Sequence, residues 1–161
     1  MRRWGIRILV AACVALVGAQ LVPVAATNPP VEPGQTLEAV LPVPPEVTTI
    51  LGRACQDCHS NRTVWPWYSR VAPVSWFLAY HVNEGRGELN FSEWGRYAAR
   101  RKDRKLKEMC EQVTKGEMPL LSYTLGHPQA KLSDQDKRRV CQWTDAVRKS
   151  GAPTAATAPS R

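Results

Sequence analysis

Hydrophobic residues recur at the spacing of an α-helix in four stretches of the chain. The predicted helices cover Pro45 to His59, Pro73 to Glu84, Ser92 to Lys115, and a last stretch that begins at Ser133. No stretch shows the alternation of polar and apolar residues that a half-buried strand requires. The pattern therefore predicts a small all-α domain with one core, over about residues 46–150.

Typical boundary residues mark the ends of these helices. Gly85 and Gly116 are expected to end the second and third helices, because glycine readily adopts the conformation that closes a helix. Ser133 is suited to cap the last helix, with Asp134 and Asp136 in its positively polarised first turn. The buried stripe of that helix is expected to consist of Val140, Trp143 and Val147.

Residues 1–26 have the pattern of an export signal. Three arginines precede the uncharged run Ile8 to Val24: Arg2, Arg3 and Arg7. The run is long for a signal-peptide core and slightly short for a membrane span, and its positive end is expected to stay in the cytoplasm. We expect a signal anchor that forms a membrane helix and holds the rest of the chain on the periplasmic side. Cleavage after Val24-Ala25-Ala26 would instead release a soluble periplasmic protein.

Two further segments have compositions that do not build a core. Eight of the 13 prolines lie in the first 66 residues, and Thr27 to Pro45 is expected to be an extended, semi-rigid spacer. Residues 151–161 are rich in Ala, Pro and Thr and are expected to form a disordered tail.

The charge balance argues against nucleic acid as a partner. The chain has 22 Lys and Arg against 14 Asp and Glu; without the three N-terminal arginines the balance is 19 to 14, or +5, which is too modest. The most basic stretch, Arg100 to Lys107, is expected to be a solvated helix face. Its alternative role is docking to an acidic redox partner or to anionic lipid.

One pentapeptide carries most of the candidate chemistry: Cys55-Gln56-Asp57-Cys58-His59. Two thiols three positions apart are placed to add across the vinyl groups of one haem, and the following histidine reaches the iron from the same turn. The motif predicts a single covalent haem c, attached through Cys55 and Cys58 and ligated by His59. In c-type cytochromes this attachment takes place outside the cytoplasm, which agrees with export.

Three other interpretations of the two cysteines compete with haem. A thioredoxin-like redox pair needs a preceding strand, and none is predicted. A zinc site needs further clustered ligands, whereas the remaining candidates are scattered: His81, Cys110, His127 and Cys141. A disulfide between cysteines only three positions apart is uncommon.

A haem that carries electrons usually has a second axial ligand. Met118, which is followed by Pro119 and lies 59 residues beyond His59, is the main candidate for this distal position. His81 is the alternative, through bis-histidine ligation, and His127 lies in a loop that also allows approach. The plainer interpretation of each histidine is an ordinary core or surface imidazole, and that of Met118 is a core-filling loop residue.

Two further residue groups affect the expected site. Asn61 to Val71 is too aromatic for a solvated loop, so its three aromatic residues are expected to shield the haem or to complete a small core: Trp65, Trp67 and Tyr68. Outside the motif the chain has three more cysteines: Cys13 in the N-terminal run, Cys110 and Cys141. In an oxidising compartment Cys110 and Cys141 either form a disulfide or stay buried as free thiols.

Several long stretches resemble the bacterial haem-binding domain family: CQDCHSNRTVWPWYSRVAPVSWFLAYHVNEGRGELNFSEW, the later GEMPLLSYTLGHPQAKLS, and a last helix with Trp143. The resemblance covers Glu46 to about Lys149 and implies an exported, cytochrome c-like domain with one haem. The order of motif, Met-Pro loop and final helix is also similar to class I cytochromes c. Leu51 stands where those proteins have an aromatic residue, and Trp143 is expected to fill the space.

These features predict a c-type cytochrome that passes single electrons outside the cytoplasmic membrane to an unidentified redox partner, rather than an enzyme. The alternative is a haem-based sensor or a peroxidase-like enzyme, in which the sixth position of the iron is open or only weakly held by Met118.

Overall fold

The computed structural model describes residues 2–151, and every regular element in that range is helical. The α-helices are α1 (Arg2–Ala19), α2 (Leu37–Val40), α3 (Pro45–Ala54), α4 (Gln56–His59), α5 (Val74–Glu88), α6 (Ala99–Lys115), α7 (Leu121–Gly126) and α8 (Asp134–Lys149). Four 3-10 turns join them: η1 (Pro33–Gln35), η2 (Trp67–Arg70), η3 (Phe91–Arg96) and η4 (Pro128–Ala130). The predicted all-α class is confirmed. The tail expected over 151–161 lies outside the described residues, apart from Gly151.

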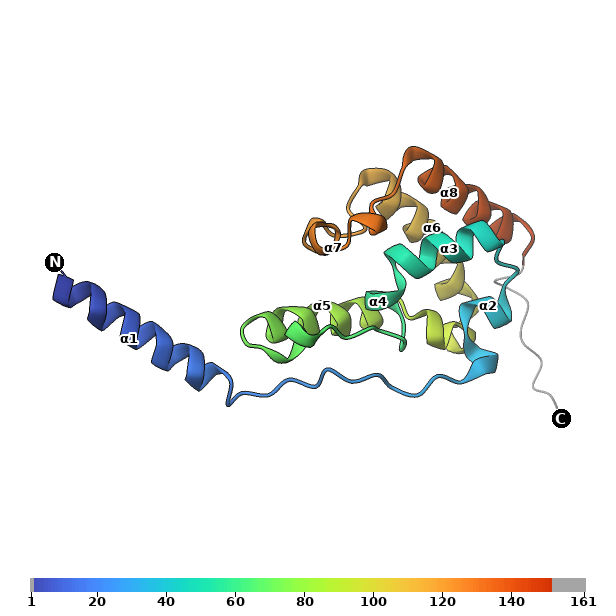
Figure 1. Cartoon of the computed structure of the whole chain (residues 1–161). Coiled ribbons are helices and arrows are strands. Elements are labelled where there is room, and N and C mark those ends of the chain that lie inside the picture. The colour runs from blue at the N-terminus through green and yellow to red at the C-terminus, as the bar shows by residue number, and fades with distance from the viewer. Residues whose placement is uncertain (1, 152–161) are drawn as a thin grey trace.

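Helix α1 projects away from the other helices, which pack together (Figure 1). The membrane helix expected over Ile8 to Val24 is not present in that form, because α1 begins at Arg2 and ends at Ala19, before Gln20 and Pro23. Between residues 2 and 151, no helix is both long enough and apolar enough to cross a membrane.

The chain after α1 is attached to the domain along its length. The Gln20 side chain exchanges hydrogen bonds with the backbone of Ala72, at 3.0 and 3.1 Å. The Arg86 guanidinium donates to the carbonyl of Thr27 at 3.1 Å and to Oδ1 of Asn28 at 2.7 Å. It also donates to the carbonyl of Ser60, the residue just after the cysteine motif, at 2.9 Å. The proline-rich segment is thus extended, as expected, but it lies on the domain surface.

The hydrophobic core begins upstream of the predicted boundary at residue 46. Leu37 of α2 and the adjacent Leu41 are buried against Trp94 of η3, so the second half of the expected spacer is part of the fold. Leu51 and Trp143 belong to the same cluster. This agrees with the prediction that Trp143 fills the space beside Leu51, which stands where class I cytochromes c have an aromatic residue. The buried members of this core are Leu37, Leu41, Val47, Leu51, Leu89, Phe91, Trp94, Leu106, Met109, Trp143 and Val147.

Two predicted helices are interrupted. The first breaks at Cys55, whose backbone angles (φ −128°, ψ −36°) separate α3 from α4. The third divides into η3 and α6, because Tyr97 adopts an extended conformation and its hydroxyl accepts a hydrogen bond from the backbone N–H of Asn90 at 2.7 Å. Asn90, not Ser92, caps η3 with its side chain.

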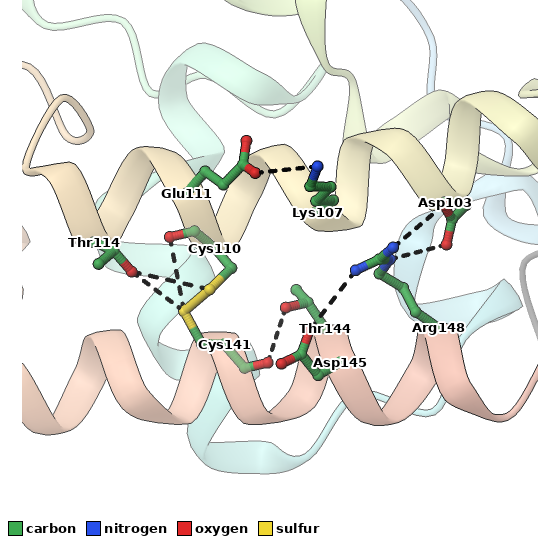
Figure 2. A network of polar contacts seen from close by, with 9 residues as sticks. All are labelled: Asp103, Lys107, Cys110, Glu111, Thr114, Cys141, Thr144, Asp145 and Arg148. Atoms are coloured by element: carbon green, nitrogen blue, oxygen red, sulfur yellow. Dashed lines mark hydrogen bonds and ion pairs between the residues drawn. A yellow bond between two sulfur atoms is a disulfide. The ribbon is translucent and has the colours of Figure 1, made fainter.

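Helices α6 and α8 lie side by side and are linked at two levels (Figure 2). Cys110 and Cys141 form a disulfide, which selects one of the two states that the sequence allows. Farther along, Nε of Arg148 donates to Asp103 at 2.9 Å. The predicted boundaries hold in this region: Gly116 ends α6 with φ +74°, and Ser133 forms a capping box with Asp136 at the start of α8.

Candidate functional site

His59 is held in one tautomer by the end of α5. Its Nδ1 lies 2.9 Å from the carbonyl oxygen of Gly85 and 3.1 Å from that of Leu89. Because carbonyl oxygens only accept, Nδ1 must carry the proton, and Nε2 keeps its lone pair. Burial lowers the pKa of His59, although the two carbonyls oppose the shift. A neutral imidazole with a fixed Nδ1–H is the form in which histidine binds a metal.

Gly85 allows α5 to approach the cysteine motif this closely. The sequence predicts that Gly85 ends the second helix, but α5 continues through it to Glu88. A Cβ at this position would lie 2.6 Å from the carbonyl oxygen of Cys58, so the absence of a side chain serves packing instead of helix termination.

Gly85→Ala is therefore expected to destabilise the protein by about 1–3 kcal/mol, because backbone must shift to admit the methyl group. Gly87→Ala is the matched control in the same helix, since its Cβ meets nothing within 4 Å. It is expected to stabilise α5 by up to about 1 kcal/mol. Urea unfolding measures both changes, and equal midpoints for the two variants would contradict the packing role of Gly85.

Cys55 and Cys58 are unpaired thiols at the junction of α3 and α4. Burial raises the pKa of Cys55 to about 12, and its neighbour Cys58 adds to the shift. Burial, with the nearby Asp57 carboxylate, raises the pKa of Cys58 to about 11. Thioredoxin-like cysteines have lowered pKa values, because the thiolate is their reactive form. The environment of this pair is the opposite of a redox CxxC site.

Two adjoining cavities meet at the motif. One has a volume of about 400 Å³ and the other about 270 Å³, and both include Cys55, His59 and Met118 in their walls. Such volumes are typical of pockets for small organic molecules. The walls of the larger cavity are mainly apolar, formed by Ile50, Leu51, Ala54, Leu89, Phe91, Met109, Val113, Leu132 and Val140 among others.

The loop that contains Met118 is fixed to the motif from both sides. Tyr123 of α7 donates its hydroxyl to Asp57 at 2.8 Å. Arg53, at the end of α3, donates to the carbonyl of Gln129 and binds the Asp136 carboxylate at 2.7 Å. These contacts hold the loop of Met118 beside the two cavities that His59 borders. No local pattern in the sequence marks the roles of Arg53, Asp57 and Tyr123, because their partners lie far away in the chain.

The other distal candidates lie farther to one side. His81 lines the smaller cavity together with His59, but not the larger one. Its Nδ1 donates to the carbonyl of Phe77 at 2.8 Å, one turn earlier in α5. His127 stacks on Tyr123, with ring centroids 4.3 Å apart, and lines a separate cavity of about 290 Å³. Met118 is thus the only one of the three that shares both cavities with His59.

The aromatic residues after the motif lie beside these cavities. Trp65 and Tyr68 line the neighbouring 290 Å³ cavity, which also includes Cys58. Trp65 donates its indole N–H to Asn28 of the attached N-terminal segment at 3.0 Å. Trp67, by contrast, is 80% exposed, and its position does not exclude water from the site.

The basic stretch of α6 includes a buried cation. Lys105 has a side chain only 8% exposed and lines the 400 Å³ cavity, where its ammonium binds Glu88 at 3.0 Å and Glu108 at 2.7 Å. Burial opposes its charge, but the two carboxylates outweigh burial and raise the pKa of Lys105. Lys102 is buried as well. The expectation of a fully solvated basic face is wrong at these two positions, and no local sequence signal distinguishes them.

Comparison with known proteins assigns the chain to a family. The model of the haem-binding domain family matches residues 14–146, which is most of the chain. The chain belongs to the haem-binding domain family. No curated protein and no solved structure matches it. The match begins well before residue 46, in agreement with a haem-binding domain whose core includes Leu37 and Leu41.

Haem is therefore the ligand to test against the site. The cavities, the free lone pair of His59 and the two thiols beside it suit a flat apolar macrocycle with a central metal. A zinc site has less support, because no group of three or more His, Cys, Asp or Glu side chains within residues 2–151 is placed to hold a metal. In this haem-binding domain, two of the scattered candidate ligands, Cys110 and Cys141, are joined to each other.

Proposed function

We propose that this haem-binding domain is a c-type cytochrome that carries single electrons. The observation that supports it most directly is the position of His59. Its Nδ1–H is held by two carbonyls of the α5 end, and its ring lines the cavities that also include Cys55 and Met118. An axial histidine oriented by backbone acceptors has a fixed ring and increased basicity.

Cys55 and Cys58 would hold the haem through two thioethers. Both thiols are free and border the smaller cavity with His59; Cys55 lies at the break between α3 and α4, and Cys58 lies within α4. Each thiol would supply both the sulfur and the hydrogen that add across a vinyl group. When bound, the haem supplies an iron that changes oxidation state by one electron.

Met118 would be the distal ligand. It is half-buried, lies in the loop between α6 and α7, and borders both cavities with His59. A thioether favours ferrous iron, and a ligand at the sixth position keeps small molecules from binding, as suits electron transfer. The largely apolar cavity wall limits solvent access, which further sets the reduction potential.

The proposed place of action is outside the cytoplasmic membrane. The N-terminal segment, with three arginines followed by an uncharged run, supports export of the chain. The disulfide between Cys110 and Cys141 suits an oxidising compartment. If cleavage removes the N-terminal segment, the exported carrier is a free periplasmic protein. If the segment is kept, it is the part of the chain that would hold the carrier at the membrane.

One preparation of the exported wild-type protein tests this proposal. We expect a six-coordinate haem c spectrum in both oxidation states, unchanged by carbon monoxide. A spectrum that changes with carbon monoxide would instead support the sensor or peroxidase-like alternative. The mass of the exported protein shows whether the N-terminal segment is kept: a product that begins near Thr27 would indicate cleavage, while leaving electron transfer intact.

A further inference from the structure

His59 and Met118 both border two cavities. Among the described residues, Lys105 is the only lysine or arginine in the walls of these cavities. It contributes to the larger cavity and not to the smaller one, whereas Cys58 contributes to the smaller and not to the larger. The buried cation and the second attachment thiol therefore lie in different parts of the combined space.

A buried ammonium is costly unless anions surround it. Lys105 has two such partners, Glu88 and Glu108, and an ammonium has three N–H donors. These two partners account for two of its donors, which leaves one N–H for a group inside the cavity. The side chain is thus charged, and it borders the cavity.

The two glutamates do not depend on Lys105 alone. The Glu88 side chain is 76% exposed, and Arg101 and Arg104 contribute to the lowering of its pKa, after the larger effect of Lys105 itself. Glu108 also lies 3.5 Å from Nε of Arg104. A carboxylate inside the cavity would have Lys105 as its only cationic partner among the described residues of the wall, which also includes Glu88 and Glu108.

We propose that Lys105 binds a propionate carboxylate of the haem by a charge-assisted hydrogen bond. The propionates are the anionic groups of haem, and they lie on the opposite edge of the macrocycle from the vinyl groups that would bond to Cys55 and Cys58. The thioethers would hold one edge of the haem, and Lys105 would hold a carboxylate at the opposite edge. Together these two attachments would fix the plane of the ring. This inference rests on the proposed function.

Resonance Raman spectroscopy of the haem-loaded protein tests the contact, because the propionate bending band shifts with the hydrogen bonds of the carboxylate. Lys105→Met is expected to shift this band to lower frequency and to lower the reduction potential, since the lost cation no longer favours the reduced haem. Lys102→Met is the matched control: Lys102 is also buried, lies one turn earlier in α6 and borders neither cavity. It is expected to leave the band unchanged.

Lys105→Arg is a second test variant, for use if Lys105→Met does not fold. It keeps the charge but presents a planar donor, so we expect haem loading with a smaller, measurable band shift. A band that is the same in wild type and in every loaded Lys105 variant would overturn the inference. Absence of covalent haem from the wild-type chain would instead contradict the proposed function, and haem staining of a denaturing gel separates the two failures.

Discussion

Replacing Cys55 and Cys58 together by alanine is expected to give a chain that carries no covalent haem. Each thioether needs one of these sulfurs, and both border the smaller cavity that His59 also borders. Haem staining after denaturing electrophoresis, with the intact mass of the protein, measures the loss. The effect should be complete for the double variant and partial for each single one, because one thioether is sufficient to retain haem on a denatured chain.

The chain contains its own matched control for this experiment. Cys110→Ser with Cys141→Ser also removes two sulfurs, but these belong to the disulfide between α6 and α8, which is far along the chain from the motif. That variant is expected to be less stable and still to stain for haem. Covalent haem in the Cys55→Ala/Cys58→Ala protein would show that the attachment site lies elsewhere.

Met118→Ala is expected to open the sixth position of the iron and convert a carbon monoxide-insensitive protein into one that binds the gas fully. The reason is that Met118 borders both cavities of His59, while His81 borders only one of them. Met118→His should keep six-coordination but lower the reduction potential, because imidazole favours ferric iron more than a thioether does. Optical spectra and a redox titration measure these changes.

Two variants separate ligation from general packing effects. Met109→Leu changes another methionine of the same cavity wall and is expected to leave the methionine-to-iron charge-transfer band in place. His81→Ala is expected to leave it in place as well. Absence of this band from the wild-type protein, or its survival in Met118→Ala, would transfer the distal role to His81 and favour bis-histidine ligation.

Features set by residues close together in the chain could be predicted from the sequence. The cysteine motif is such a case, because the two thiols and His59 lie within one turn and their spacing alone indicates the chemistry. The cap of α8 is another, since Ser133 and Asp136 bond within three residues. The helical class follows in the same way from periodicity, which is a local property of each segment.

Other features depend on which segments pack together, and no local signal contains that information. Gly85 has the appearance of a helix stop, but its role comes from the backbone of Cys58, 27 positions earlier. Leu37 lies in a proline-rich stretch and is nevertheless fully buried. The pairing of Cys110 with Cys141 likewise depends on how α6 packs against α8.

The candidate site shows the same division. The sequence by itself indicated the proposed attachment thiols, the proposed axial histidine and a short choice of distal candidates, because each is a matter of residue type and spacing. Only the tertiary structure decided that Met118 borders both cavities of His59 and that Lys105, within a run of similar basic residues, borders the larger of these cavities. The physical reason is that burial and the approach of charges are set by helix packing across α4, α5 and α6, which neighbouring residues in the chain do not specify.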